Sequence, residues 1–454
     1  MILKRKIYSK LLEWENECKG TKAILIEGAR RIGKSTVAEE FAKNEYKSYI
    51  LIDFSKGDLE VENYFNLYLN DLDTFFMMLS IHFGVKLENR NSLIIFDEVQ
   101  LFPKARAAIK HLVADGRYDY IETGSLISIK ENVRDIVIPS EERHIKMYPL
   151  DFEEFLWAMQ EEPLADYIKD CFVNKKELER SLHNKALLLF KQYMLVGGMP
   201  KPLVVFITGH KDFSSCDAEK RDILELYRSD IMKIKDQYRS KVLSLYDQIP
   251  GLLSKHEKRV ILKDIDRDKG SSFARYEETF FWLADSMIAN ECFLTRDPNV
   301  GLSINETRSY IKCYFLDTGL LVSHAFDENE LLEDEIYKQI LNDKLSINEG
   351  MLYENVIAQM LVANGHKLYF YTSYSQEKHR NDIEIDFIIS NNSKLKYKIF
   401  PIEVKSSPKY STSSLDKFNE KFRSRIGCSY IIHPRNLIVK ENTICIPPYM
   451  TFCI

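Results

Sequence analysis

A glycine-containing stretch near the N-terminus constrains the fold of this 454-residue chain more than any other feature. It reads Gly-Ala-Arg-Arg-Ile-Gly-Lys-Ser at residues 28–35 and fits the pattern G-x-x-x-x-G-K-[ST] at every fixed position. The apolar run at residues 23–26 precedes it with the length and β-branching of a buried strand, and residues 36–43 follow with helical spacing. Because backbone N–H groups surround phosphate oxygens in a strand–loop–helix of this kind, the motif predicts a phosphate-binding parallel α/β domain.

The loop residues have separate chemical roles in such a site. Gly28 and Gly33 allow the backbone to curl, and the start of the following helix adds a positive dipole end. Lys34 is expected to reach the β- and γ-phosphates, and Ser35 to ligate Mg²⁺. A glycine-rich surface turn is the alternative, which the flanking strand and helix disfavour. We therefore expect ATP and Mg²⁺ as cofactors. The expected nucleotide-binding residues are Gly28, Ala29, Arg30, Arg31, Ile32, Gly33, Lys34, Ser35 and Thr36.

A second strand-like run ends in two acids, as a nucleotide-hydrolysing site requires. Residues 92–96 are mostly apolar and lead into Asp97 and Glu98. Asp97 is the expected Mg²⁺ ligand, through water or through Ser35, and Glu98 is the expected general base for the attacking water. An acidic pair at the end of a strand can also be structural. Downstream of a phosphate loop, the catalytic interpretation is favoured.

Further along this part of the chain lie candidates for sensing the γ-phosphate. Thr123 and Ser125 follow another short strand-like run, and either hydroxyl could contact the γ-phosphate or the attacking water; capping of the strand end is the alternative. Arg134 and Arg143 are candidates for an arginine that reaches the γ-phosphate of a neighbouring copy. Each of these arginines could equally be a solvated surface charge.

Length and composition limit the class of protein. The apolar fraction of 45% and charged fraction of 29% are ordinary for a soluble protein, and no apolar run has the length of a membrane span. The basic N-terminus lacks the apolar stretch of a secretory signal, so we expect a cytoplasmic protein without membrane association. The eight cysteines show no C-x-x-C pair and are expected to be buried thiols.

The pattern of apolar residues divides the chain into three expected domains. Residues 1–160 alternate strand-like and helical segments, which indicates a parallel sheet with the ligand at the carboxyl ends of its strands. Residues 161–326 are mainly helical, and two strand-like segments after the helices follow the order of a winged helix. Residues 345–454 form the third domain after a polar, acidic connection. The expected strands of the first domain are 23–26, 49–52, 93–96, 120–123 and 144–148.

The middle domain is a candidate for DNA contact. Its expected recognition region carries several cations, which a solvated helix face explains equally well. They are Lys255, Lys258, Arg259, Lys263, Arg267 and Lys269.

A second group of charged residues lies near the C-terminus. Glu354 is on an expected helix, Asp386 lies in a β-branched run, and Glu403-Val-Lys405 lies on the next strand. Strand alternation places Glu403 and Lys405 on one face. Glu354, Asp386 and Glu403 are the expected ligands of Mg²⁺ or Mn²⁺, and Glu403 and Lys405 are the expected catalytic residues for attack on a phosphodiester. Exposed salt bridges on edge strands are the alternative.

The charge of the chain is unevenly distributed. Its formal net charge is −5, but residues 345–454 hold 14 Lys and Arg against 10 Asp and Glu, a balance of +4. Several of those acids belong to the Glu354, Asp386 and Glu403 group. The remaining surface of the third domain is therefore expected to be basic.

With its phosphate loop and acidic pair near the N-terminus and its charged residues near the C-terminus, the chain resembles one family. This family is the prokaryotic AAA-superfamily ATPases that carry a C-terminal PD-(D/E)XK nuclease-like domain. The resemblance covers nearly the whole chain, and it implies a restriction-endonuclease-like α/β core for the third domain. It assigns ATPase roles to Lys34, Ser35, Asp97 and Glu98. One departure is the lack of the usual sensor asparagine, where Thr-Gly-Ser stands instead. The segments that carry the resemblance are 28–35, 94–100, 123–125, 148–155, 197–200, 312–320, 353–355, 384–387 and 401–406.

The first functional interpretation is an ATPase whose nucleotide state controls a metal-dependent DNA-binding or nuclease-like C-terminal domain. An alternative is a nucleotide-driven signalling switch or DNA-binding module with an inactive nuclease fold. A transport or chaperone-like motor acting on protein is a third. DNA, contacted through the middle and C-terminal domains, is a candidate partner besides ATP, and assembly into a homo-oligomer is left open.

Overall fold

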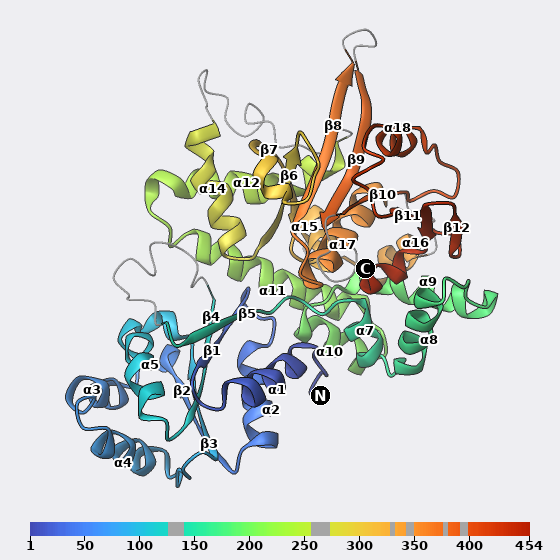
Figure 1. Ribbon diagram of the computed structural model, residues 1–454. Coiled ribbons are helices and arrows are strands. Elements are labelled where there is room, and N and C mark those ends of the chain that lie inside the picture. The colour runs from blue at the N-terminus through green and yellow to red at the C-terminus, as the bar shows by residue number, and fades with distance from the viewer. Residues whose placement is uncertain (126–139, 256–272, 327–331, 342–348, 376–379, 391–397) are drawn as a thin grey trace. The chain divides into compact units, whose positions relative to one another are not determined.

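The computed structural model describes residues 1–125, 140–255, 273–326, 332–341, 349–375, 380–390 and 398–454. The chain folds into two compact units (Figure 1). The N-terminal unit comprises Ile2–Tyr148 with Asp285–Met287. The C-terminal unit comprises Pro149–Ala284 and Ile288–Ile454, with Met1.

The N-terminal unit is built on a five-stranded sheet in the order β2-β3-β4-β1-β5, and every pairing in it is parallel. Its strands are β1 Ala23–Glu27, β2 Ser48–Asp53, β3 Ser92–Asp97, β4 Asp119–Gly124 and β5 Glu142–Lys146. Its helices are α1 Ile7–Cys18, α2 Lys34–Glu45, α3 Leu59–Leu67, α4 Leu72–Phe83 and α5 Pro103–Asp115. The predicted parallel α/β arrangement is confirmed. The last strand lies at 142–146, where 144–148 was expected.

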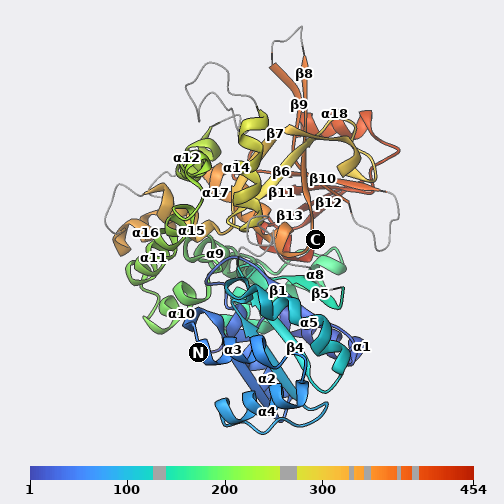
Figure 2. The same ribbon diagram turned by 90° about the vertical axis from the view of Figure 1, so that its left-hand side faces the viewer.

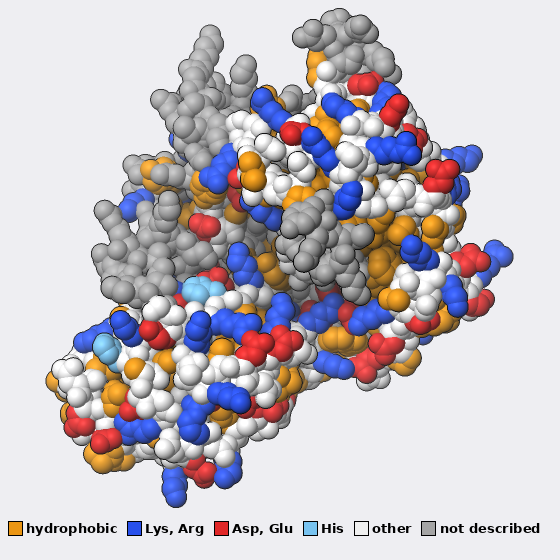
Figure 3. Space-filling model, in the orientation of Figure 1, with side chains coloured by type: hydrophobic (Ala, Val, Ile, Leu, Met, Phe, Trp, Pro, Cys, Tyr) orange, Lys and Arg blue, Asp and Glu red, His pale blue; other side chains and the backbone are white. Residues whose placement is uncertain are grey.

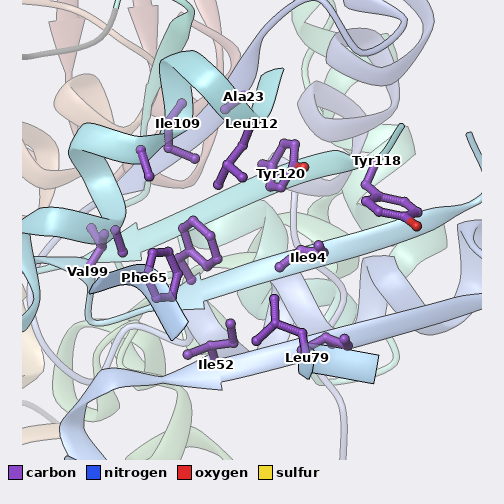
Figure 4. Packing of buried hydrophobic residues seen from close by; sticks show 14 of the residues in the cluster. Ala23, Ile52, Phe65, Leu79, Ile94, Val99, Ile109, Leu112, Tyr118 and Tyr120 are labelled. Atoms are coloured by element: carbon purple, nitrogen blue, oxygen red, sulfur yellow. The ribbon is translucent and has the colours of Figure 1, made fainter. Parts of the chain in front are cut away.

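Apolar strands explain why this sheet forms. Every residue of β1 and β3 is buried, as expected for strands covered on both faces. On one face, side chains of α3, α4 and α5 pack against β2, β3 and β4, and Figure 4 shows Phe65, Ile109 and Leu112 against Ile52 and Ile94. This core fixes the carboxyl ends of the strands, where the sequence predicts the nucleotide.

The C-terminal unit begins with helices, as predicted for residues after 160, and ends in a mixed α/β region. The helices of this unit lie among the described residues. They are α7 Phe152–Ala158, α8 Glu162–Val173, α9 Arg180–Val196, α10 Pro200–Thr208, α11 Phe213–Ile231, α12 Asp236–Ser254, α14 Phe273–Asp285, α15 Thr318–Ala325, α16 Asp334–Leu341, α17 Glu349–Ala363 and α18 Ser413–Lys421.

A mixed eight-stranded sheet in the order β12-β13-β11-β10-β9-β8-β6-β7 runs through this unit. Long strands β8 and β9 pair antiparallel and extend together in both ribbon views (Figures 1 and 2). Strand β10 pairs antiparallel with β9 and parallel with β11. The strands are β6 Ala289–Thr295, β7 Glu306–Phe315, β8 Leu368–Ser375, β9 Arg380–Ser390, β10 Ile399–Val404, β11 Ser429–Ile432, β12 Ile438–Lys440 and β13 Thr443–Ile446.

The hairpin expected as the wing of a winged helix is formed by β6 and β7, and it belongs to the C-terminal sheet. Strands β6 and β7 pair antiparallel as expected, but β6 also pairs parallel with β8 and joins the C-terminal sheet. The expected boundary between residues 326 and 345 therefore lies inside one unit. The expected recognition region lies, beyond Lys255, outside the described residues, so the winged helix stays a prediction.

Two of the segments that carry the family resemblance, 197–200 and 312–320, meet Gln359 of α17 in a buried junction of the C-terminal unit. The Asp317 carboxylate accepts hydrogen bonds from the N–H groups of Gly198 (2.6 Å) and Leu320 (2.9 Å) and from Gln359 Nε2 (3.1 Å). A Cβ on Gly197, whose φ is 85°, would lie 2.2 Å from Asp317 Oδ1, so this position requires glycine. These motifs therefore join α9, α15 and α17. Among the described helices, none has the length and apolarity to cross a lipid bilayer.

Candidate functional site

The phosphate loop connects β1 to α2 in the predicted way. A Cβ on Gly28 would lie 2.3 Å from Ile32 Cδ1 and 2.6 Å from the carbonyl oxygen of Met147, so only glycine fits there. Gly33 and Arg31 have φ values of 93° and 66°, which tighten the turn before the helix. Because Gly33 is the N-cap and makes no side-chain cap, the first N–H groups of α2 are available to an anion.

Lys34 is almost fully buried in this loop. Its ammonium donates hydrogen bonds to the carbonyl oxygens of Gly28 (3.0 Å) and Ala29 (2.8 Å). Burial lowers the pKa of Lys34 to about 8, although the carboxylates of Glu98 and Asp97 act to raise it. A cation whose charge is opposed by burial gains most from a nearby anion such as a phosphate.

The predicted metal-binding residues meet at the carboxyl end of β3. The Ser35 hydroxyl donates to Asp97 Oδ1 at 2.6 Å, and the Thr123 hydroxyl donates to the same oxygen. Burial raises the pKa of Asp97, and these two hydrogen bonds act to lower it. A hydroxyl and a carboxylate side by side form a hard-oxygen donor set that fits Mg²⁺, so Ser35 and Asp97 are the residues that would hold the ion.

Glu98 lies beside Asp97 in a left-handed conformation with φ 53°, which is uncommon for a residue with a side chain. Its Oε2 accepts hydrogen bonds from Gln100 Nε2 and from the Ser125 hydroxyl (3.3 Å). Arg30 Nε in turn lies 3.4 Å from the Ser125 hydroxyl. Both sensor candidates therefore contact the acidic pair. Gln100 was missed by the sequence analysis, although its position two residues after Glu98 was visible.

The C-terminal group of charged residues also comes together, on α17, β9 and β10. Tyr314 donates its hydroxyl to Glu354 Oε2 at 3.2 Å, and the Val404 N–H donates to Asp386 Oδ2 at 2.8 Å. Lys405 Nζ lies 2.9 Å from Glu403 Oε2, and Glu403 is buried. Neither oxygen of Glu403 accepts an aligned hydrogen bond within the described part of the chain. Burial raises the pKa of Glu403 to about 7, and Lys405 opposes this shift.

The described part of the chain does not group the expected metal ligands of this second set around one ion. Glu403, buried and without a hydrogen bond, fits a cation by itself. However, no three His, Cys, Asp or Glu side chains within the described ranges are placed to hold one ion together. This arrangement gives no support to the divalent metal predicted from Glu354, Asp386 and Glu403, and that metal stays a prediction.

Comparison with known families separates the parts of the chain. Residues 20–156 match a family described as an AAA domain. Residues 187–330 and 349–451 match two families described as domains of unknown function, DUF8612 and DUF4143. Residues 20–156 are thus similar to an AAA domain, and the loop at 28–35 lies within this match. We refer to the N-terminal unit as the AAA domain below.

Solved structures provide further matches. A Walker-type ATPase of Pyrococcus abyssi aligns with a TM-score of 0.39 and 15% identity, over 71% of this chain and 96% of that protein. A signal transduction ATPase with numerous domains and a tetratricopeptide-repeat sensor, from Pyrococcus horikoshii, aligns with a TM-score of 0.27 and 11% identity, over 80% of this chain and 45% of that protein. No curated protein matches the sequence.

Arg143, the arginine-finger candidate within the described residues, is not brought to the phosphate loop of its own AAA domain. Arg143 is near the start of β5, paired in register with Ile24, and its guanidinium forms an ion pair with Glu17 at 2.7 Å. The start of a parallel strand lies at the opposite edge from the loop that follows β1. Arg134 lies outside the described residues. A contact with a neighbouring copy is untested for both arginines.

Arg5 is a contact of the phosphate loop that the sequence analysis missed. Its Nη1 donates to the carbonyl oxygen of Ile32 at 2.8 Å, and its Nη2 donates to that of Tyr148 at 2.6 Å. The side chain is buried. Arg5 therefore ties the loop to Tyr148, where the main segment of the AAA domain ends. Nothing in the spacing of a basic N-terminus distinguishes this arginine from its neighbours.

A network of charges, buried except at His144, also lies beside the loop in the AAA domain. The His144 ring contacts Glu27 Oε1 (2.9 Å) and Glu142 Oε2 (2.8 Å), and Arg106 pairs with Glu142 at 2.9 Å. Hydrogen bonds to Glu142 and Glu27 raise the pKa of His144 to about 9. Burial, and then Glu142, raise the pKa of Glu122 well above its ordinary value. The sequence signal for this network was the presence of Glu122 and His144 within expected strands.

Proposed function

We propose that this protein hydrolyses ATP in its AAA domain and that the bound nucleotide controls the binding of nucleic acid by the C-terminal unit. The observation that carries the first half is the contact of Ser35, Thr123 and Asp97, with Lys34 and Glu98 beside it. Residues from α2, β3 and β4 thus meet where phosphate, metal and water chemistry require them.

The residues divide the work of hydrolysis among themselves. Lys34 exchanges its carbonyl contacts for phosphate oxygens, and the N–H groups at the start of α2 complete the cradle. Ser35 and Asp97 would hold Mg²⁺, which would supply neutralisation of the phosphate charge. Glu98 accepts the proton of the attacking water. The Ser125 hydroxyl, which contacts the Glu98 carboxylate, orients that water.

Measuring phosphate release and ATP affinity in parallel tests this proposal. We expect Glu98→Gln to lower kcat by about 10²–10⁴-fold while ATP affinity is retained, because a general base acts only in the chemical step. Lys34→Ala removes ATP binding in a calorimetric titration. Glu13→Gln, on the exposed side of α1, is the matched control and leaves both quantities unchanged.

Each variant has an outcome that contradicts a different part of the proposal. Hydrolysis by Glu98→Gln at the wild-type rate contradicts the role of Glu98 as base. An unchanged ATP affinity of Lys34→Ala contradicts nucleotide binding by this loop.

Charge on the C-terminal unit supports the second half of the proposal. Figure 3 shows several Lys and Arg side chains, interspersed with Asp and Glu, over the part of the surface where α18 lies. The connection from β10 through α18 to β11 carries two acids, Asp416 and Glu420, against six cations. Three of the cations pair with Glu403, Asp382 and Asp297, so Lys409, Lys421 and Arg423 are the ones that support contact with a phosphate backbone. The cations are Lys405, Lys409, Lys417, Lys421, Arg423 and Arg425.

Binding without cleavage is favoured over nuclease activity. The reason is that the described part of the chain does not group the residues of the second set around one ion. The C-terminal unit is then a nucleic-acid-binding module with a nuclease-like motif, controlled by ATP. Incubation of plasmid DNA with Mg²⁺ or Mn²⁺ decides the point, since cleavage lost in Glu403→Gln would restore the nuclease interpretation.

A further inference from the structure

The carbonyl oxygen of Ile32 is a buried acceptor within the phosphate loop. Ile32 is fully buried, and helix α2 begins two residues later. The first acceptor of that helix is the carbonyl oxygen of Gly33, which receives the N–H of Val37 at 3.0 Å. The Ile32 carbonyl thus lies outside the hydrogen-bond ladder of α2, and it needs a donor from another part of the chain.

Arg5 supplies this donor. Its Nη1 donates to the Ile32 carbonyl oxygen at 2.8 Å and its Nη2 to that of Tyr148 at 2.6 Å, so one planar guanidinium spans both acceptors. Arg5 is 8% exposed. A charged donor makes a stronger hydrogen bond to a carbonyl than a neutral donor does, and burial shields this bond from water.

Both sides of this contact are fixed by the backbone of the AAA domain. Arg5 lies two residues before α1, and its own carbonyl oxygen accepts the N–H of Tyr8 at 3.1 Å. The N–H of Met147 donates to the carbonyl oxygen of Glu27 at 2.8 Å, which holds the chain before Tyr148 against the end of β1. Arg5 therefore holds its acceptor in the loop at a set place relative to the sheet.

The orientation of one peptide group follows from this contact. The C=O and N–H of a trans peptide point in opposite directions, and the described residues contain no cis peptide. Because Arg5 holds the carbonyl of Ile32, the N–H of Gly33 points away from the guanidinium. Gly33 and Arg31 are both left-handed, with φ values of 93° and 66°, and residues of this kind occur in nests of N–H groups that bind anions.

The same peptide group would turn over easily without a partner. Glycine adopts positive and negative φ values at little cost, so Gly33 itself does not oppose the rotation. A reversed peptide would present the Ile32 carbonyl dipole where the N–H now points, and this dipole would repel a phosphate. The hydrogen bond from Arg5 opposes the reversal, because a buried acceptor and a buried donor would both lose their partner.

We propose that Arg5 is a positioning residue for phosphate binding: it holds the Ile32 carbonyl and so keeps the N–H of Gly33 directed toward a bound triphosphate. The inference rests on the proposed binding of ATP by this loop. It adds a residue of the N-terminal segment, outside the phosphate-loop motif, to those that determine nucleotide affinity.

NMR of the deuterated full chain, with ¹³C-carbonyl Ile and ¹⁵N-Gly labels, observes this peptide group directly. The pair Ile-Gly occurs twice, at 32–33 and 426–427, so two cross-peaks arise and Ile426→Val removes the second. A non-hydrolysable ATP analogue with Mg²⁺ should shift the amide proton of Gly33 in wild type downfield, as a new hydrogen bond to phosphate does.

Arg5→Met removes both donors and keeps an apolar stem. We expect the ¹³C resonance of the Ile32 carbonyl to move upfield already without nucleotide, and the downfield shift of Gly33 on adding the analogue to be smaller. In a calorimetric titration, the affinity for the analogue should fall at least about tenfold.

Arg90→Met is the matched control. Arg90 also donates to a backbone carbonyl, that of Gly116, and it pairs at 3.1 Å with Asp119, which begins β4 at the edge of the sheet opposite to the loop. We expect this variant to keep the wild-type affinity and both wild-type Gly33 spectra. In Arg5→Lys, affinity should recover only as far as the Ile32 carbonyl resonance returns to its wild-type position.

Three outcomes overturn the inference and leave the proposed function intact. They are analogue binding by wild type without a downfield shift of Gly33, wild-type affinity in Arg5→Met, and recovered affinity in Arg5→Lys without recovery of the carbonyl resonance. If Arg5→Met does not fold, the wild-type titration decides alone. A wild type that does not bind the analogue contradicts the proposed function, and this inference with it.

Discussion

His144 illustrates how a single residue depends on its neighbours for its charge. It lies in β5 between Glu27, directly before the phosphate loop, and Glu142, which also pairs with Arg106. Both carboxylates favour the protonated ring. The positive charge of His144 therefore stabilises the pairing of β5 with β1, the strand that leads into the phosphate loop.

We predict a pH dependence of stability that arises from His144. The pKa is raised from 6.5 to about 9 on folding, so the stabilisation is complete below about pH 6.5 and is lost as the pH rises through about 9. The difference in free energy of unfolding between wild type and His144→Gln should thus shrink over this range. Urea unfolding at several pH values measures it. His111→Gln, exposed on α5, is the control, and a constant difference between wild type and His144→Gln would contradict the prediction.

Motif residues of the site could be predicted individually, and supporting residues could not. Lys34, Ser35 and Asp97 follow from local spacing, because a strand, a tight loop and a helix fix their geometry. Arg5 contacts carbonyl oxygens of Ile32 and Tyr148, and backbone acceptors leave no residue-type signature.

At the scale of elements, the junction around Asp317 shows how helices of the C-terminal unit are held together. Its carboxylate satisfies N–H groups at the end of α9 and the start of α15, and a side-chain amide of α17. A Cβ on Gly319 would lie 2.4 Å from the carbonyl oxygen of Val196, so the two backbones approach closely here. Small residues and one carboxylate are thus both required.

Removing this carboxylate should weaken the C-terminal unit strongly. We expect Asp317→Ala to lower its free energy of unfolding by on the order of 3 kcal/mol, because several buried donors lose their acceptor. Asp317→Asn keeps one acceptor oxygen and should lose less. Urea unfolding followed by circular dichroism measures both. Equal midpoints for Asp317→Ala and wild type would show that the contacts are dispensable.

Elements of the AAA domain were predictable because strands buried on both faces read as continuous apolar runs. The pairing of β6 with β8 was not, because its register depends on residues far apart in the chain, Cys292 with Leu368 and Leu294 with Phe370. A local helix-then-hairpin order cannot specify which sheet the hairpin joins. This is why the expected wing belongs to the C-terminal sheet.

At the scale of the whole molecule, the proposed control of the C-terminal unit by ATP is a coupling between two sites. Thermodynamic linkage requires that such coupling be reciprocal. If ATP changes DNA affinity by a given factor, DNA changes ATP affinity by the same factor.

We predict a coupling on the order of tenfold, measured in both directions on the Glu98→Gln variant, which retains ATP without hydrolysing it. Fluorescence anisotropy gives DNA affinity with ATP or ADP, and calorimetry gives ATP affinity with and without DNA. Charge reversal of Lys409 and Arg423 should abolish the DNA binding and leave ATP affinity intact. Equal DNA affinity with both nucleotides would separate the two activities.

Strand β6 covers one side of β8 throughout the pairing of Cys292–Leu294 with Leu368–Phe370. A fragment that begins near residue 349, where the family match begins, would lack β6. The backbone N–H and C=O groups of β8 that pair with β6 would then be unsatisfied. Such a fragment would self-associate through the bare edge. The β6–β7 hairpin therefore prevents this edge of the C-terminal sheet from pairing with other copies of the protein.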